Sequence, residues 1–354
     1  MRLVLTLFFI ASCAFAQPGA QLPPVAACGA AAGPGAEVLC GARAPEDLEV
    51  TPDGKALLVA QYASFRGGST EHVGIALFDL ATKKYTPIAV TDAPDKTWGD
   101  PACPGPIGEK LAAHGTSLAK RANGGAWQYF VVNHGGRQSI EMFELKKAGA
   151  TWSLIWHGCV VAEKDYNDVA ALADGGYIAT HPTALQTPGQ PGGTPFDGSP
   201  TGWVARWTPG KGEAELPGTR FGYPNGVVAS ADGRFAYYAA WTAKEIHKYD
   251  LRAGKDVAVT KLDFMPDNIT WNPKSQLIAA GVKGARGNCP AESKTPCIMG
   301  FGVAQLDPGN MKVGKTFDSA DRPLISGVSV ALQVGPAVYV GAFQGDRLVR
   351  LDWK

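Results

Sequence analysis

Six copies of one short pattern organise this chain and constrain its fold more than any other feature. Each copy begins with a polar pair and enters a short apolar strand, and most copies then turn at a Gly- or Asp-containing tip into a second strand. The six pairs are Glu46-Asp47, His114-Gly115, Asn167-Asp168, Asn225-Gly226, Asp267-Asn268 and Ser326-Gly327. Self-similarity at a spacing of tens of residues indicates a repeat architecture, and four-stranded sheets repeated around an axis form a propeller.

A further strand follows each hairpin, with the alternation of polar and apolar side chains that is typical of β-structure. These strands span residues 74–80, 139–145, 202–207, 245–251, 302–307 and 347–352. The sequence therefore predicts an all-β fold, a six-bladed β-propeller with four-stranded blades around a central channel. By analogy with other propellers, we expect Ala36–Cys40 to close the ring against the C-terminus. The one helical feature expected is a turn around residues 107–113.

The N-terminal segment has the pattern of an export signal. Arg2 precedes a short apolar stretch, and Ala14-Phe15-Ala16 resembles a cleavage site. Cleavage after Ala16 predicts a secreted or periplasmic protein, and the alternative is a lipoprotein anchored at Cys13, because residues 10–13 resemble a bacterial lipobox. Residues 17–36 have the composition of a flexible leader, so we expect the propeller to span residues 37–354.

Composition excludes some partners and indicates the redox environment. The formal net charge of +1 offers no electrostatic case for binding nucleic acid or an anionic membrane. No segment after the export signal is long and apolar enough to span a bilayer. The chain has seven cysteines, and the six after the signal favour disulfides in an exported protein. Cys289 and Cys297 flank a short polar loop and are the pair expected first.

The first residues of the six pairs form a column in which every member is polar. If the copies are blades, this column is a ring at one mouth of the channel. Five residues of the pairs offer oxygen, and we call them the oxygen ring: Glu46, Asn167, Asn225, Asp267 and Asn268. Carboxylate and amide oxygens suit a hard cation such as Ca²⁺, and two carboxylates neutralise its charge. The alternative is that these residues make local turn hydrogen bonds.

The second residues of two pairs are acidic where other copies have mostly Gly. Because side chains alternate along a strand, we expect Asp47 and Asp168 to point away from the first column. They could bind a second, deeper cation together with a backbone carbonyl near Thr116. The alternative, in which backbone amides satisfy each carboxylate, fits the sequence almost as well.

Two histidines lie at the same mouth as the oxygen ring. His114 begins the inner hairpin of the second copy, and His134 follows its end. A neutral imidazole beside a Lewis-acidic cation is an arrangement for hydrolysis, in which the base activates water. His181 is a weaker candidate for the wall of the site. The loops at residues 91–106 and 183–200 are either lids or surface elaborations.

At these residues the chain resembles the paraoxonase/arylesterase family of six-bladed, calcium-dependent lactonases, and more distantly the gluconolactonase and strictosidine synthase-like propellers. The matching stretches are residues 46–49, 113–117, 131–134, 167–169, 224–227, 230–233 and 267–269. The resemblance implies two calcium ions: a catalytic ion held by Glu46, Asn167, Asn225, Asp267 and Asn268, and a structural ion held by Asp47, Asp168 and the Thr116 carbonyl. It also implies that His114 and His134 form a catalytic dyad.

The chain departs from this family at three places. Family members have a His shortly after the fifth inner hairpin, where this chain has residues 281–284 without one. The family's disulfide between the two ends cannot form, because no Cys follows Cys297. The N-terminus has the pattern of a cleavable signal and not of a retained hydrophobic anchor.

Three functions remain open from the sequence. The first is a calcium-dependent hydrolase of small-molecule lactones or aryl esters. The second is a non-catalytic propeller that binds a ligand or partner, with calcium as a structural plug. The third is a sugar-lactone hydrolase of the gluconolactonase type, which would use the metal site without requiring His134.

Overall fold

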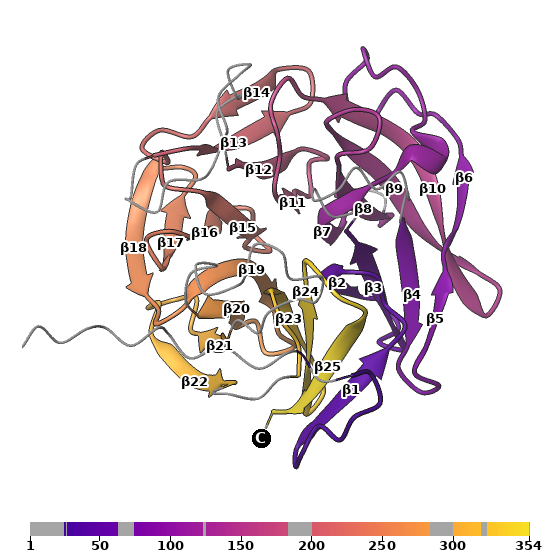
Figure 1. Ribbon diagram of the computed structural model, residues 1–354. Helices are drawn as coiled ribbons and strands as arrows, with labels where there is room; N and C mark the ends of the chain where they lie inside the picture. The colour runs from indigo at the N-terminus through magenta and orange to yellow at the C-terminus, as the bar shows by residue number, and fades with distance from the viewer. Residues whose placement is uncertain are drawn as a thin grey trace, which may run out of the picture.

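The computed structural model describes residue 25 and residues 27–62, 74–122, 125–182, 200–283, 300–319 and 324–353. Six small sheets surround a central axis, as Figure 1 shows. This arrangement is the predicted six-bladed β-propeller. Within the described residues, no helix is long and apolar enough to cross a membrane.

The blades follow one another along the chain, and in blades one, three, four and five the innermost strand comes first in sequence. Blade one comprises β2 (Pro45–Val50), β3 (Ala56–Gln61), β4 (Ile75–Asp79) and β5 (Lys84–Pro87). Blade two comprises β7 (Ala113–Lys120), β8 (Trp127–Asn133), β9 (Ser139–Ala148) and β10 (Thr151–Val161), with β6 (Ala89–Asp92) added parallel to β10. Blade three comprises β11 (Val169–Ala171), β12 (Tyr177–His181), β13 (Trp203–Thr208) and β14 (Gly212–Glu215).

The second half of the ring repeats the same order. Blade four comprises β15 (Pro224–Ala229), β16 (Phe235–Ala240), β17 (Glu245–Asp250) and β18 (Lys255–Lys261). Blade five comprises β19 (Met265–Trp271), β20 (Leu277–Lys283), β21 (Gly300–Leu306) and β22 (Val313–Asp318). Blade six comprises β23 (Val328–Val334), β24 (Ala337–Ala342), β25 (Arg347–Asp352) and β1 (Ala36–Cys40).

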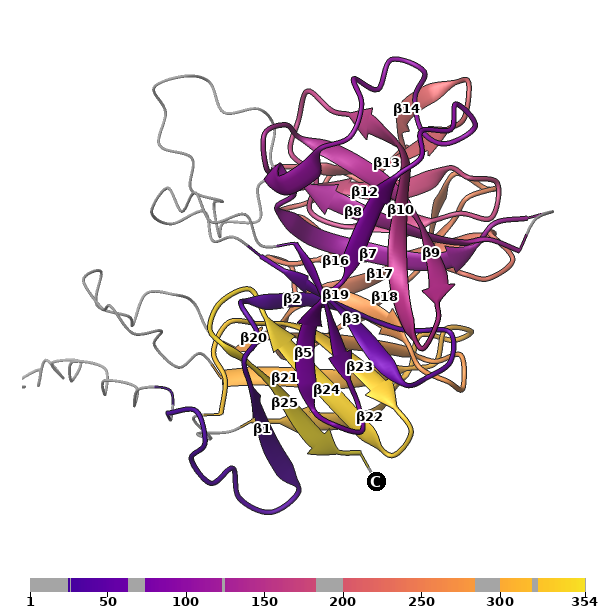
Figure 2. The ribbon, with the colours of Figure 1, turned by 90° about the vertical axis from the view of Figure 1, so that its right-hand side faces the viewer.

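The two ends of the chain close the ring, as predicted. Strand β1 pairs with β25 in antiparallel register from Ala36 opposite Leu351 to Cys40 opposite Arg347. Figure 2 shows the two strands side by side next to blade one, whose Tyr85 hydroxyl donates to the Leu39 carbonyl. The N-terminal segment thus completes a sheet that the C-terminal segment alone leaves with three strands.

Two disulfides are formed among the described residues. Cys28 bonds Cys40, which ties the segment before β1 to its last residue, and Cys103 bonds Cys159 on β10. The expected pair of Cys289 and Cys297 lies outside the described residues.

Strand composition follows each strand's place in the blade. Strand β24 is buried along its whole length, because neighbouring blades cover both faces, and its sequence is a continuous run of apolar and small residues. The outermost strand β18 instead alternates exposed and half-buried residues. The helical turn expected at residues 107–113 is a 3₁₀ helix, η1 (Gly108–Lys110).

Candidate metal centre and histidine dyad

The polar pairs lie where the innermost strands begin, at an end of the channel that we call the front mouth. The strands β2, β7, β11, β15, β19 and β23 contact one another around the axis (Figure 1). In five blades, the innermost strand carries one extra residue here relative to its neighbour. A bulge of this kind re-aims side chains, so alternation alone no longer decides which side chain faces the axis.

The bulge corrects the sequence alignment of blade six. In blade one, the irregularity lies between Pro45 and Asp47, and it therefore falls at Glu46. In blade six, it lies between Val328 and Val330, so the residue equivalent to Glu46 is Ser329 and not Ser326. The Ser329 hydroxyl donates to the Glu46 carbonyl oxygen over 2.6 Å. The alignment was wrong because Ser326-Gly327 has the same polar-then-Gly pattern as two other copies.

The oxygen ring is buried and its members contact one another. Asn268 Nδ2 donates to Glu46 Oε1 over 2.8 Å, and the Asn225 amide donates to the Asp267 carboxylate. The amide nitrogen of each of these two asparagines therefore donates to a neighbouring carboxylate, and its amide oxygen is left to accept. Across the described part of the chain, no hydrogen-bond partner reaches four buried oxygens of the ring, namely Glu46 Oε2, Asn167 Oδ1, Asn225 Oδ1 and Asn268 Oδ1.

Buried acceptors without a partner destabilise the fold, because they lose their hydrogen bonds to water and gain none within the protein. A cation would satisfy them. The donor set of two carboxylates and three amides suits a hard cation such as Ca²⁺. Among the described residues, no group of three or more His, Cys, Asp or Glu is placed to hold a metal, so this candidate depends on its amide oxygens.

Carboxyl groups are concentrated at and beside the ring. Burial, together with the nearby charges of Asp47, Asp267 and Asp168, raises the pKa of Glu46 well above its usual value. Burial also raises the pKa of Asp267 and Asp168, and it raises the pKa of Asp47 to about 6. In the described residues, none of the four carboxyls forms an ion pair with Lys or Arg. A bound divalent cation would favour the ionised form of these carboxyls and lower their pKa values.

The acidic residues of the second column have a different environment. Asp47 accepts from the backbone N–H of Leu48 with one oxygen and from the N–H and hydroxyl of Thr116 with the other. Asp168 likewise accepts from the N–H groups of Val169 and Val227. Each carboxylate thus joins its own blade to another innermost strand, which is the amide-satisfied arrangement that the sequence left open. The second calcium ion stays a prediction.

Close passage of neighbouring strands explains why other copies have Gly in the second column. A Cβ atom at Gly226 would lie 2.5 Å from the Asp267 carbonyl oxygen and 2.5 Å from the Asn268 Cα. Contacts this short do not occur, so only Gly allows blade four to approach the ring residues of blade five this closely.

The histidine dyad adjoins the oxygen ring. His114 Nε2 lies 3.7 Å from Glu46 Oε1, and His114 Nδ1 lies 3.0 Å from His134 Nε2. Tyr62 stacks on the His114 ring with the centroids 4.5 Å apart. Burial lowers the pKa of His114 well below its usual value, with a further contribution from His134, and burial also lowers the pKa of His134. Both imidazoles are therefore neutral at neutral pH.

Other predicted residues lie elsewhere or have different partners. His181 is buried in blade three, where its Nε2 contacts Glu213 Oε1 at 2.9 Å. At the place of the missing family histidine, Lys283 forms ion pairs with Asp263 and Asp318. Residues 93–107 lead from β6 to η1 and are attached to β10 by Cys103–Cys159, whereas residues 183–199 of the other loop lie outside the described residues.

Sequence reasoning missed three residues of the site: Ser329, Tyr62 and Gln138, whose side chain contacts His134. A polar residue in the apolar strand of blade six was the available signal for Ser329. Nothing in the sequence indicated Tyr62 or Gln138, because neither lies in the repeated pair.

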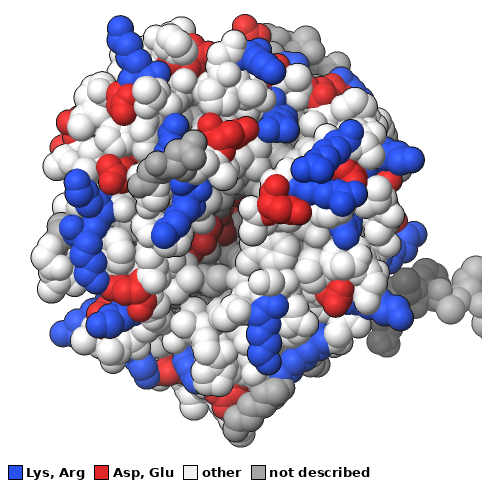
Figure 3. Space-filling view, turned by 180° about the vertical axis from the view of Figure 1, so that it is seen from behind, with Lys and Arg blue, Asp and Glu red and all other residues white. Residues whose placement is uncertain are grey.

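The opposite end of the channel opens on the face seen in Figure 3, where acidic atoms are visible in a central hollow. A cavity of about 510 Å³ there is lined by residues that include Asp47, Thr116, Trp127 and Trp271. Asp47 of the second column therefore borders the end of the channel opposite the dyad. Glu49 also lines this cavity, and burial raises its pKa to about 8.

Comparison with known proteins places these features in a family. Residues 109–286 match the family described as SMP-30/Gluconolactonase/LRE-like region. The chain is 25% identical over 245 residues to human serum paraoxonase/arylesterase 1, and the match covers 65% of this chain and 63% of the human protein, less than two thirds of its length.

Solved structures show the same fold at low sequence identity. A luciferin-regenerating enzyme superposes with a TM-score of 0.52 at 14% identity, over 90% of this chain and 95% of that one. A gluconolactonase from Xanthomonas campestris has a TM-score of 0.52 at 16% identity, over 95% of this chain and 96% of that one. With a family match over half of its length, the chain belongs to the lactonase-like SMP-30/gluconolactonase/LRE-like propellers.

Proposed function

We propose that this protein is a secreted, calcium-dependent hydrolase of lactones or aryl esters, with its active site at the front mouth. The observation that carries the proposal is the set of four buried oxygens, without a hydrogen-bond partner among the described residues, beside two neutral histidines that contact each other. A metal-binding set of oxygens next to a base can catalyse hydrolysis. In a purely structural role, the same unpaired oxygens would only lower the stability of the fold.

The residues present fit a calcium ion. Glu46, Asn167, Asn225, Asp267 and Asn268 would hold it, and each of them except Asp267 has an oxygen without a hydrogen-bond partner within the described residues. When bound, calcium would polarise a carbonyl group and stabilise the negative charge that develops on its oxygen. Asp47, Asp168 and the Thr116 carbonyl would hold a second, structural ion.

The histidines supply the base. His114 is neutral and directs Nε2 toward the ring, where it can accept a proton from water that attacks the substrate carbonyl. His134 contacts the other nitrogen of His114 and can share the resulting positive charge. Tyr62 stacks on His114 and holds its plane.

A second candidate is a sugar-lactone hydrolase, and the family match, whose description names gluconolactonase, favours it. Such an enzyme would use the oxygen ring and would not require His134. The non-catalytic alternative is less consistent with the buried dyad, because a binding module has no need of two histidines in contact beside the metal site.

Export accords with the two disulfides, which form in oxidising compartments. We propose cleavage after Ala16, with lipidation at Cys13 as the alternative. Mass spectrometry of the N-terminus of protein recovered from a bacterial host with a native export pathway would distinguish the two.

The first test is hydrolysis of a panel of aliphatic lactones, sugar lactones and aryl esters, before and after calcium chelation. We expect turnover that stops on chelation and returns with calcium, while circular dichroism reports a folded chain. Isothermal titration of the chelated protein gives calcium binding independently of activity. A folded protein that binds calcium and hydrolyses no member of the panel would contradict the proposal and favour the binding module.

A further inference from the structure

The dyad belongs to a longer chain of polar contacts that ends at a glutamine. Glu46 Oε1 lies 3.7 Å from His114 Nε2, and His114 Nδ1 lies 3.0 Å from His134 Nε2. His134 Nδ1 then contacts Gln138 Oε1 at 2.6 Å. Four side chains therefore form one line of contacts from the oxygen ring outward.

The amide oxygen at the end of this line determines where the protons lie. Gln138 Oε1 can only accept, so His134 Nδ1 must carry the proton. Because His134 is neutral, its Nε2 is then an acceptor and His114 Nδ1 must donate to it. His114 Nε2 is left without a proton and faces Glu46, which is the state that a general base requires.

We infer that Gln138 is a positioning residue that selects the tautomers of both histidines and thereby keeps His114 Nε2 free to act as the base. This inference rests on the proposed function, in which His114 accepts a proton from water. If the acceptor at Gln138 is removed, His134 can take the opposite tautomer, with its proton on Nε2. His114 Nδ1 then becomes the acceptor, and the His114 proton moves to Nε2, where it blocks the base.

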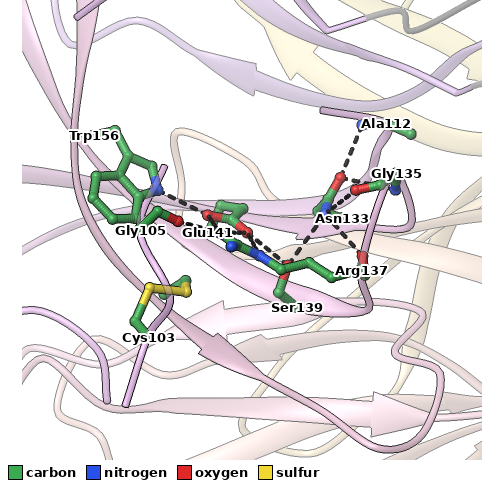
Figure 4. A network of polar contacts seen from close by, with 10 residues as sticks. Cys103, Gly105, Ala112, Asn133, Gly135, Arg137, Ser139, Glu141 and Trp156 are labelled. Atoms are coloured by element: carbon green, nitrogen blue, oxygen red, sulfur yellow. Dashed lines mark hydrogen bonds and ion pairs between the residues drawn. A yellow bond between two sulfur atoms is a disulfide. The ribbon is translucent and has the colours of Figure 1, made fainter. Parts of the chain in front are cut away.

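The chain segment that carries His134 and Gln138 is held in place by a network shown in Figure 4. Asn133 Oδ1 accepts from the N–H groups of Ala112 and Gly135, and Asn133 Nδ2 donates to the carbonyls of Gly135 and Arg137. The Gln138 carbonyl accepts from the N–H of Ala162. Several hydrogen bonds thus hold the turn between β8 and β9, so the backbone that carries the Gln138 side chain has a fixed position.

The same network continues into the core of blade two. Arg137 forms a bidentate pair with the fully buried Glu141, and Glu141 also accepts from Ser139 and from Trp156 Nε1. Arg137 donates in addition to the Gly105 carbonyl, close in sequence to the disulfide at Cys103. This support holds the backbone next to Gln138, so that its side chain can keep its contact with His134 Nδ1.

Protons balance along the line of contacts. When water attacks the carbonyl, one O–H bond of water breaks, a C–O bond forms and His114 Nε2 gains the proton. His114 Nδ1 can pass its proton to His134 Nε2, which leaves the positive charge on His134, where Nδ1–H still donates to Gln138. When the leaving alkoxide departs, the same steps reverse and the alkoxide takes the proton.

The test combines a spectroscopic readout of the tautomers with kinetics. The six histidines can be labelled with ¹⁵N and assigned with single His→Asn variants. In the wild type, two-bond ¹H–¹⁵N correlations should show His134 and His114 both protonated on Nδ1. A wild-type His134 protonated on Nε2 would overturn the inference without any variant.

The variants are Gln138→Met, which removes the acceptor, and Gln138→Glu, which keeps it. For Gln138→Met we expect the His134 signals to shift toward the other tautomer and kcat to fall about 10- to 100-fold with little change in KM. For Gln138→Glu we expect the wild-type tautomers and recovery of most of kcat. Gln305→Met is the matched control, because Gln305 lies on β21, where it contacts Gln276.

Unchanged tautomers in Gln138→Met would contradict the inference, whether or not kcat falls. The failure of the proposed function looks different. If the wild type hydrolyses nothing on the panel, the imidazole signals still report whether Gln138 sets the tautomers.

Discussion

Buried polar groups of the front mouth and of blade three are arranged in opposite ways. In blade three, the Glu213 carboxylate accepts from His181, Tyr166 and Tyr177, and the other nitrogen of His181 contacts the Asp165 carbonyl. In the oxygen ring, four buried oxygens have no partner within the described residues. Blade three therefore contains a complete network, whereas the ring contains an incomplete one.

This contrast separates structure from function. A complete network needs nothing else, and its role is to stabilise the blade and specify its packing. An incomplete network is costly to the fold, and this cost is acceptable where a ligand completes the network. The Glu141 network of blade two resembles the Glu213 network of blade three in this respect, because both oxygens of Glu141 are paired.

The largest effect is expected from removing the base of the incomplete site. His114→Asn should lower kcat by about 10² to 10⁴-fold, the usual contribution of general base catalysis, with calcium affinity nearly unchanged. Lactone hydrolysis and calcium titration measure the two quantities. His157→Asn is the matched control, since His157 contacts Glu144 on the outer part of blade two. Equal activity of the two variants would remove the functional distinction between the regions.

Breaking a complete network should instead affect stability. Arg137→Met leaves the fully buried Glu141 without its cation and should cost about 3–5 kcal/mol of unfolding free energy. The double variant Arg137→Met, Glu141→Met removes both charges and should recover part of this loss. Urea denaturation measures both changes. A single variant as stable as the wild type would show that the pair contributes little.

Calcium should reverse the effect of one ring substitution on the stability of the fold, from stabilising to destabilising. Without calcium, Asp267→Asn removes a carboxyl group that burial makes costly to ionise, and it should stabilise the fold by on the order of 1 kcal/mol. With calcium at about 100 times its Kd, the wild type should gain about 2.7 kcal/mol, and Asp267→Asn should gain less. Asp256→Asn, in the paired His247 network of blade four, should destabilise equally in both conditions. Thermal unfolding with and without chelator measures these changes, and a Tm of Asp267→Asn below the wild type in chelator would oppose the proposal.

The smallest effect concerns pH and the complete network of blade three. Burial alone would raise the pKa of Glu213, but hydrogen bonds and charge from His181 and hydrogen bonds from the two tyrosines outweigh it and lower the pKa. The unfolded pKa is therefore the higher one, so this stabilisation is fully present above pH 4.5 and is lost as pH falls through the folded pKa. Between pH 6 and 3, Glu213→Gln should lose less unfolding free energy than the wild type. If the unfolding free energies of the wild type and Glu213→Gln fell in parallel over this pH range, protonation of Glu213 would not contribute to the pH dependence of stability.

Much of the fold was predictable because its signals are local. Strand alternation, tip residues and the spacing of the six copies predicted the blades, analogy with other propellers predicted the closing strand, and the structure confirms both. The site was only partly predictable. Register errors of a few residues, as at Ser326 and Ser329, escape a pattern that several positions satisfy.

What the sequence determined by itself is the number of blades and the polar character of the ring, since both depend on the type and period of neighbouring residues. The tertiary structure decided which oxygens lack donors and which side chains fix the histidines. The Glu46 side chain receives its hydrogen bond from Asn268, 222 positions away, and that contact exists only once the ring has closed. The bulges at the polar pairs then re-aim the side chains, and this step follows from backbone pairing between strands and not from the order of residues within one strand.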